Sequence, residues 1–90
     1  MPAKQYEVKI KLIRNDSPCH YGLKIGDEWE FDYSPPADIC SFAFNSIYPF
    51  AVVMKTGGTF PWQQDTDVLT VACPDPEVHN IFEIRRKPKK

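Results

Sequence analysis

Three cysteines and two histidines are the residues of this chain that could hold a soft metal ion or act as nucleophiles. They are Cys19, His20, Cys40, Cys73 and His79. The cysteines form no C-x₂-C pair, so a shared site must be assembled from distant parts of the chain. Three thiolates and one imidazole make a complete tetrahedral ligand set for zinc or ferrous iron, and three thiolates alone suit a softer ion such as copper(I). These five residues are therefore candidate ligands of one metal ion.

Other roles for the same thiols stay open. Cysteine is often buried as a small apolar side chain, which would leave all three inert. A nucleophilic thiol needs a base within hydrogen-bond reach. His20 adjoins Cys19, but neighbouring side chains in an extended chain point apart. An odd number of cysteines cannot form a closed disulfide framework, and a two-iron cluster lacks its fourth cysteine. The thiols alone therefore do not assign the chain to an enzyme class.

All three cysteines are expected at the ends of secondary-structure elements, where functional residues often gather above a rigid scaffold. Cys19 falls in the loop after the first predicted strand, and Cys73 is the last residue of the third. Cys40 falls in the first turn of a helix predicted to be capped by Asp38. Free N–H groups there favour a thiolate, and the Asp38 carboxylate opposes it, so the net effect should be modest.

Four segments have the pattern of β-strands. "YEVKIKLI" from Tyr6 and the stretch Glu28–Tyr33 alternate apolar and charged residues, which is typical of half-buried strands. "VLTVAC" and "IFEIR" are the third and fourth predicted strands. We therefore predict one α+β domain over residues 1–90, with a small antiparallel or mixed sheet of about four strands packed against two short helices. Its ordered core is expected at about 5–86, followed by a basic C-terminal tail.

The segment 34–58 has helical spacing but contains a proline. Asp38 can cap the helix, and Pro49 lacks an N–H donor and clashes with the preceding turn. We therefore predict two helices, one ending near Tyr48 and one starting at Pro49 and stopping at Gly57-Gly58. The aromatic residues expected to supply most of the core are Phe42, Phe44, Tyr48 and Phe50.

Composition and charge limit the classes of partner that this protein could bind. The net charge of −1 gives no field to attract nucleic acid or an anionic membrane. The longest nearly uncharged stretch, 39–54, is too short to span a bilayer, and no apolar signal segment opens the chain. We expect a cytoplasmic protein that binds neither nucleic acid nor membrane. The basic stretch Arg85–Lys90 is interpreted as a solvated tail.

The loop after the helical segment offers an alternative to a metal site. Phe60-Pro61-Trp62 forms an aromatic surface that could bind a protein partner or bury itself in a homo-oligomer. A metal-free structural or partner-binding module is therefore the second functional hypothesis. Asp65 and Asp67 in the same loop are predicted to be turn and capping groups rather than ligands of a hard cation.

Four sequence blocks resemble a prokaryotic family of small proteins of unknown function. They are Cys19 with the following "GLKIGDEWEF", then "ICSFAFNSIYPF", "GGTFPWQQDTD" and "ACPDPEVHNIFEIRR", and together they cover almost all of Tyr6–Arg86. Cysteines equivalent to all three of this chain recur in that family, so the resemblance implies a shared thiol site. Many members have Gly-His-Lys where this chain has Gly22-Leu23-Lys24, which argues against an essential imidazole at that position.

Overall fold

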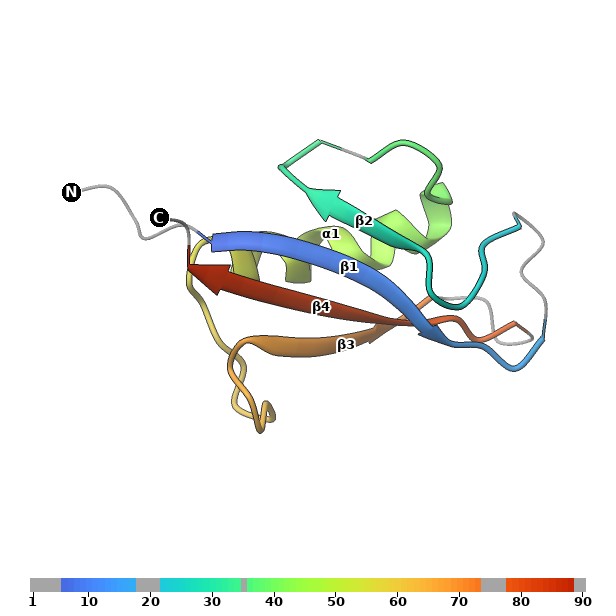
Figure 1. Cartoon of the computed structure of the whole chain (residues 1–90). Helices are drawn as coiled ribbons and strands as arrows, with labels where there is room; N and C mark the ends of the chain where they lie inside the picture. The colour runs from blue at the N-terminus through green and yellow to red at the C-terminus, as the bar shows by residue number, and fades with distance from the viewer. Residues whose placement is uncertain (1–5, 18–21, 35, 74–77, 89–90) are drawn as a thin grey trace.

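The fold begins with the alternating pattern of the first strand, which pairs with a neighbour on each side. In the computed structural model, which describes residues 6–17, 22–34, 36–73 and 78–88, the elements are β1 (Tyr6–Arg14), β2 (Glu28–Phe31), α1 (Ser41–Lys55), β3 (Val68–Ala72) and β4 (Ile81–Pro88). The strands form one sheet in the order β2-β1-β4-β3, and every pair is antiparallel. The helix α1 lies across one face of the sheet (Figure 1). The predicted α+β class and the four strands are confirmed.

Side chains alternate between the two faces of the sheet, so one face is buried and the other is exposed to solvent. Ile10 pairs with Trp29 of β2 and Ile84 of β4, and all three are buried beneath the helix. One residue further, Lys11 pairs with Glu28 and Glu83 on the open face. Full burial of a side chain such as Ile10 contributes about 1.5–3 kcal/mol. The sheet residues in the core are Val8, Ile10, Leu12, Trp29, Phe31, Leu69, Phe82 and Ile84.

One continuous helix covers the sheet, so the prediction of two helices divided at Pro49 is wrong. Ala43, Ile47, Ala51 and Met54 are fully buried and recur at helical spacing on both sides of the proline. Packing of this stripe on the sheet outweighs the hydrogen bond that Pro49 cannot donate, because tertiary packing supplies most of a helix's stability. Pro49 itself is on the exposed side of α1.

The start of α1 also differs from the prediction. Asp38 lies before the helix in a left-handed conformation (φ 65°) and does not cap it. Cys40 is the N-cap residue, with extended backbone, and its carbonyl oxygen accepts a hydrogen bond from Phe44 N at 2.9 Å. Cys40 therefore immediately precedes the first helical turn instead of lying within it.

Several aromatic residues assigned to the core are at the surface. Phe42 is 72% exposed and Tyr48 is 41% exposed, whereas Phe44 and Phe50 are partly buried against the core. Small and aliphatic side chains of α1 fill the space next to the sheet instead. Tyr33 was expected to continue the buried face of β2, but β2 ends at Phe31 and Tyr33 adopts a φ of 65° and is exposed.

The end of α1 is closed by two glycines and bonded to the first strand. Gly58 N donates to Val53 O at 2.8 Å and Gly57 N bonds Met54 O, the paired hydrogen bonds of a Schellman motif, with Gly57 at φ 91°. The predicted stop at Gly57-Gly58 is thus confirmed. Lys55 is 3% exposed, and its Nζ donates to the carbonyl oxygen of Tyr6 at 3.1 Å.

The basic C-terminal stretch is part of the sheet as far as Pro88. β4 continues through Arg85, Arg86 and Lys87, and Pro88 pairs with Tyr6 at the start of β1. The prediction of a solvated tail from Arg85 onward is therefore wrong for these four residues. Pairing with β1 satisfies their backbone groups, which a frayed end would leave to water.

Candidate thiol site at one end of the sheet

The directions of α1 and the strands bring two of the three cysteines to the same end of the sheet. Lys55, the last residue of α1, bonds the first residue of β1, so Cys40 at the other end of α1 lies toward the end of β1. β3 and β1 are both antiparallel to β4 and hence run in the same direction. Cys73, directly after β3, therefore lies at that end too, as the course of the chain shows (Figure 1).

Cys40 combines a helix N-terminus with partial burial. Its own side chain makes no capping hydrogen bond, and the first turn of α1 contains no acidic residue. Its side chain is partly buried and packs against the core cluster. The free N–H groups of the first turn favour an anionic group at this position.

Cys73 lies deeper in the protein. It is 8% exposed and belongs to the core cluster that Cys40 contacts. Its backbone N donates to Asn80 O at 2.8 Å, which extends the pairing of β3 and β4 by one step beyond Ala72. The predicted position at the end of the third strand is correct within one residue. This hydrogen bond fixes the backbone of Cys73 against the residue that precedes β4.

His79 approaches this end from the loop between β3 and β4. Its Nδ1 lies 3.1 Å from Oδ2 of Asp16, which follows β1, and Asp16 N donates to Val78 O at 2.8 Å. A carboxylate on Nδ1 orients the ring and leaves Nε2 for another partner, as in many metal-binding histidines. The His79 side chain is about half exposed, with 45% of its surface accessible.

Asn80 is a polar residue of this end that sequence reasoning missed. It is 2% exposed, and its Oδ1 accepts no hydrogen bond in the part of the chain that the structure describes. A buried acceptor left without a donor costs about 1–3 kcal/mol. Nothing in the surrounding "HNIF" pattern marks it, because an asparagine after a turn is ordinary in sequence.

The described residues do not complete a metal site among themselves. No group of three His, Cys, Asp or Glu side chains with metal-binding proximity occurs in residues 6–17, 22–34, 36–73 and 78–88. Cys40, Cys73 and His79 therefore do not by themselves form a metal-binding group. Cys19 and His20, the remaining predicted ligands, lie outside the described residues.

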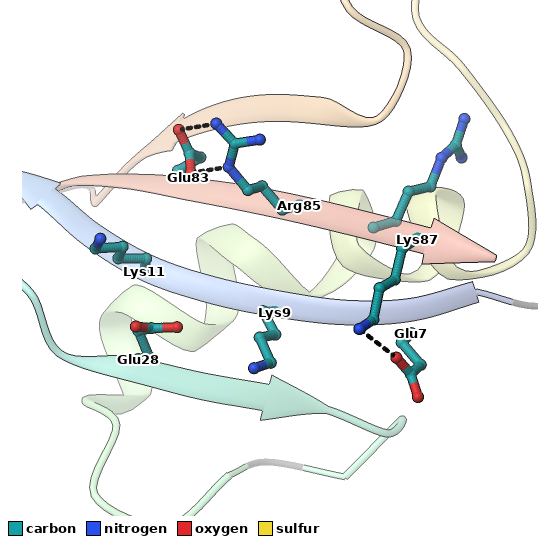
Figure 2. Close-up of a pocket in the computed structure, with 8 residues that line it drawn as sticks. Glu7, Lys9, Lys11, Glu28, Glu83, Arg85 and Lys87 are labelled. Atoms are coloured by element: carbon teal, nitrogen blue, oxygen red, sulfur yellow. Dashed lines mark hydrogen bonds and ion pairs between the residues drawn. The ribbon is translucent and has the colours of Figure 1, made fainter. Parts of the chain in front are cut away.

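A pocket on the open face of the sheet is lined by charged side chains. Figure 2 shows Glu7, Lys9, Lys11, Glu28, Glu83, Arg85 and Lys87 along β1, β2 and β4. Lys87 pairs with Glu7 at 3.4 Å, and Arg85 pairs with Glu83. Glu83 raises the pKa of Arg85 above its ordinary value, mainly through their hydrogen bond and secondly through Coulombic attraction. Positively and negatively charged side chains alternate over this face, so it attracts neither anions nor cations strongly.

The acidic loop residues have structural roles, as predicted. Asp65 Oδ1 accepts a hydrogen bond from Asp67 N at 2.9 Å, which is an Asx-type turn. Asp67 Oδ1 lies 3.2 Å from Nε of the buried Arg86. Both carboxylates are thus engaged in holding the loop and its neighbour strand.

In comparisons with known proteins, the chain matches no family model, no curated protein and no solved structure. The resemblance to a prokaryotic family stays a prediction. Within the described part of the chain, no helix is both long enough and apolar enough to cross a bilayer.

Proposed function

We propose that this protein binds a soft metal ion through the thiolates of Cys19, Cys40 and Cys73. The observation that carries the proposal is the shared direction of β1 and β3, combined with the opposite direction of α1. These directions bring the N-terminus of α1 and the end of β3 together at the end of the sheet where β1 leads toward Cys19. Cys40 and Cys73, which are 33 positions apart in the sequence, thereby lie at the same end of the sheet.

The chemistry follows from the ligands. Thiolate sulfur prefers zinc, copper(I) or ferrous iron over magnesium or calcium. Metal–sulfur bonds near 2.3 Å require the three sulfur atoms of one tetrahedral site to lie within about 4 Å of one another. Zinc takes a fourth ligand from an imidazole or water, whereas copper(I) is satisfied by three thiolates. Partial burial at Cys40 and near-complete burial at Cys73 would keep bulk water away from such an ion.

The test is metal analysis of protein purified without chelator, combined with thiol titration before and after metal removal. We expect one equivalent of a soft metal and three thiols that become reactive when it leaves. Cys40→Ser should abolish metal retention while the helix signal in circular dichroism is kept. Ser41→Ala is the matched control, because it changes the adjacent exposed residue and removes no sulfur.

The results separate the hypotheses. Full metal occupancy in Cys40→Ser would refute Cys40 as a ligand. Three thiols that stay unreactive in metal-free folded protein and titrate only after unfolding would support inert burial instead. One thiol that reacts far faster than the other two near pH 6 would indicate a nucleophile.

A second candidate function is partner binding through the loop at Phe60-Pro61-Trp62. Trp62 is 64% exposed and stacks on Phe60, with ring centroids 4.8 Å apart. Phe60 in turn contacts Phe50 of α1 at 5.5 Å between centroids, which anchors the exposed ring to the core. Exposed, rigidly held aromatic rings are typical of interface hot spots. Trp62→Ala should shift the mass measured by sedimentation without changing metal content; an unchanged mass would count against an interface here.

A further inference from the structure

The outward side of α1 carries no charge, which is unusual for a helix at a protein surface. Lys55 is the sole charged residue between Ser41 and Lys55, and it is buried. A surface helix usually presents charged residues opposite its apolar stripe. The solvent side of α1 instead presents Phe42, Asn45, Tyr48 and Pro49. This neutral, aromatic side of the helix has the composition of a binding surface.

A groove of about 670 Å³ lies along this side of α1. Phe44, Tyr48 and Pro49 line it from the helix, and Tyr33 lines it from the loop after β2. Phe44 and Tyr48 contact each other with centroids 5.6 Å apart, and both rest on the buried ring of Phe31. Tyr33 contacts Phe31 at 5.7 Å. One core ring thus holds three groove rings in place, which gives the groove a preformed shape.

Several polar groups in the groove have no hydrogen-bond partner among the residues that the structure describes. The hydroxyls of Tyr33 and Tyr48 and the side-chain amide of Asn45 make no hydrogen bond to any residue in the described part of the chain. Pro49 cannot donate to the carbonyl of Asn45, four residues earlier, so that acceptor also lacks its usual helical bond. A ligand that offers both donors and acceptors would satisfy these groups.

The charges near the groove are acidic. The side chain of Asp32, next to Tyr33, is 87% exposed, and Asp38, next to Ile39 of the groove lining, is exposed. The nearby cation is the buried Lys55, whose Nζ bonds Tyr6 O, lies 3.8 Å from Asp32 Oδ1 and lies 5.5 Å from the Tyr33 ring centroid. It offsets part of the Asp32 charge, so two carboxylates face one ammonium group. A cationic ligand is therefore favoured over an anionic one.

We propose that the groove beside α1 binds an extended, proline-containing basic segment of a partner protein. A polyproline II segment has no internal hydrogen bonds, so its carbonyl groups are free for tyrosine hydroxyls and the Asn45 amide. Its proline rings pack between aromatic side chains at low entropic cost. Basic residues in the segment complement Asp32 and Asp38. The inference concerns the outer side of α1 and does not depend on a metal at the cysteines.

The experiment is a titration of ¹⁵N-labelled protein with a blocked peptide of three Pro-Pro-Arg repeats, followed by backbone chemical shifts. We expect saturable shifts of Tyr33, Asn45 and Tyr48. Tyr48→Ala should weaken binding about tenfold or more, because it removes a central aromatic contact. Asp38→Asn removes an exposed charge at a left-handed backbone position that asparagine tolerates, and it should weaken binding by a few-fold while leaving the fold intact. Ile25→Ala, which changes an exposed apolar residue outside the groove lining, is the control and should bind normally.

Three outcomes would overturn the proposal. One is the absence of saturable shifts at millimolar peptide. Another is equal binding of a peptide with glutamate in place of arginine, which would remove the role of Asp32 and Asp38. The third is a concentration-dependent dimer that Tyr48→Ala dissociates and that the peptide does not disrupt, because a second copy of the chain would then occupy the groove.

Discussion

Arg86 Nη1 donates a hydrogen bond to the carbonyl oxygen of Met54 at 3.0 Å, which joins the last strand to the last turn of α1. The same atom donates to Gly58 O at 2.7 Å, and Nε lies 3.2 Å from Asp67 Oδ1. The guanidinium carbon also lies 4.5 Å from the ring centroid of Tyr6. A buried arginine thus satisfies carbonyl groups at the helix end, and it fixes the direction in which α1 crosses the sheet.

Arg86→Leu should destabilise the protein strongly. The change keeps an apolar stem but removes the buried donor that Met54 O, Gly58 O and Asp67 share. We expect a loss of about 2–4 kcal/mol in the free energy of unfolding. Urea denaturation followed by circular dichroism measures this. Arg85→Leu is the matched control, because Arg85 is the exposed neighbour on the open face, and it should change the midpoint far less. Equal effects of the two variants would contradict the role assigned to Arg86.

Gly58→Ala should destabilise the end of the helix by steric conflict. A Cβ at Gly58 would lie 2.5 Å from Val53 Cγ1 and 3.2 Å from Val53 O. Overpacking of this kind costs about 1–3 kcal/mol. The added variant Val53→Ala should recover part of the loss in a double-mutant cycle, because it removes the conflicting methyl group. Strictly additive effects would show that the contact with Val53 is not the cause.

Pro49→Ala should stabilise the isolated protein. Alanine supplies the N–H that Asn45 O lacks and removes the ring from the helix interior, where proline costs about 3 kcal/mol. Packing and the unfolded state offset part of this, so a gain of roughly 1–2 kcal/mol is expected. Thermal and urea unfolding test it, with Ser46→Ala as a control for helix propensity alone. A loss of stability would mean that Pro49 makes packing contacts that outweigh its missing bond.

The two tryptophans should differ in their response to quenchers. Trp29 is buried and its ring centroid is 6.1 Å from that of Phe82, whereas Trp62 is mostly exposed. Iodide should quench Trp62 emission and leave Trp29 nearly unaffected. Trp62→Phe should therefore retain a blue-shifted spectrum that iodide barely changes, while Trp29→Phe should retain a quenchable one. Strong quenching in Trp62→Phe would show that β2 does not pack as described.

Helix continuity across Pro49 shows where local reasoning fails. The sequence rule that proline ends a helix treats a missing hydrogen bond as decisive. The structure shows that Ile47 and Ala51, on either side of the proline, share one buried stripe against the sheet. The hydrophobic contribution of that stripe comes from residues far away in sequence. A rule based on neighbouring residues cannot include it.

Phe42 shows a related limit. Apolar residues surround α1 on all sides, so periodicity could not tell which side faces the sheet. Ala43 and Ile47 face the sheet because small and aliphatic side chains allow the helix and the sheet to approach each other closely. The larger Phe42 is left outside. The sequence therefore could not reveal the groove beside α1, although its three aromatic lining residues, Tyr33, Phe44 and Tyr48, are plain in the sequence.

The amino-acid sequence by itself determined the identity of the local elements: the alternation of Tyr6–Leu12, the turn at Gly26-Asp27, where Gly26 adopts a φ of 100°, and the stop at Gly57-Gly58. These features depend on dihedral preferences and side-chain periods that act over a few residues. Only the tertiary structure decided the strand order and the direction of α1. Those depend on long-range pairing of β1 with β4 and on the contacts of Arg86 with the helix end. These long-range interactions are also the reason that Cys40 and Cys73 lie at the same end of the sheet.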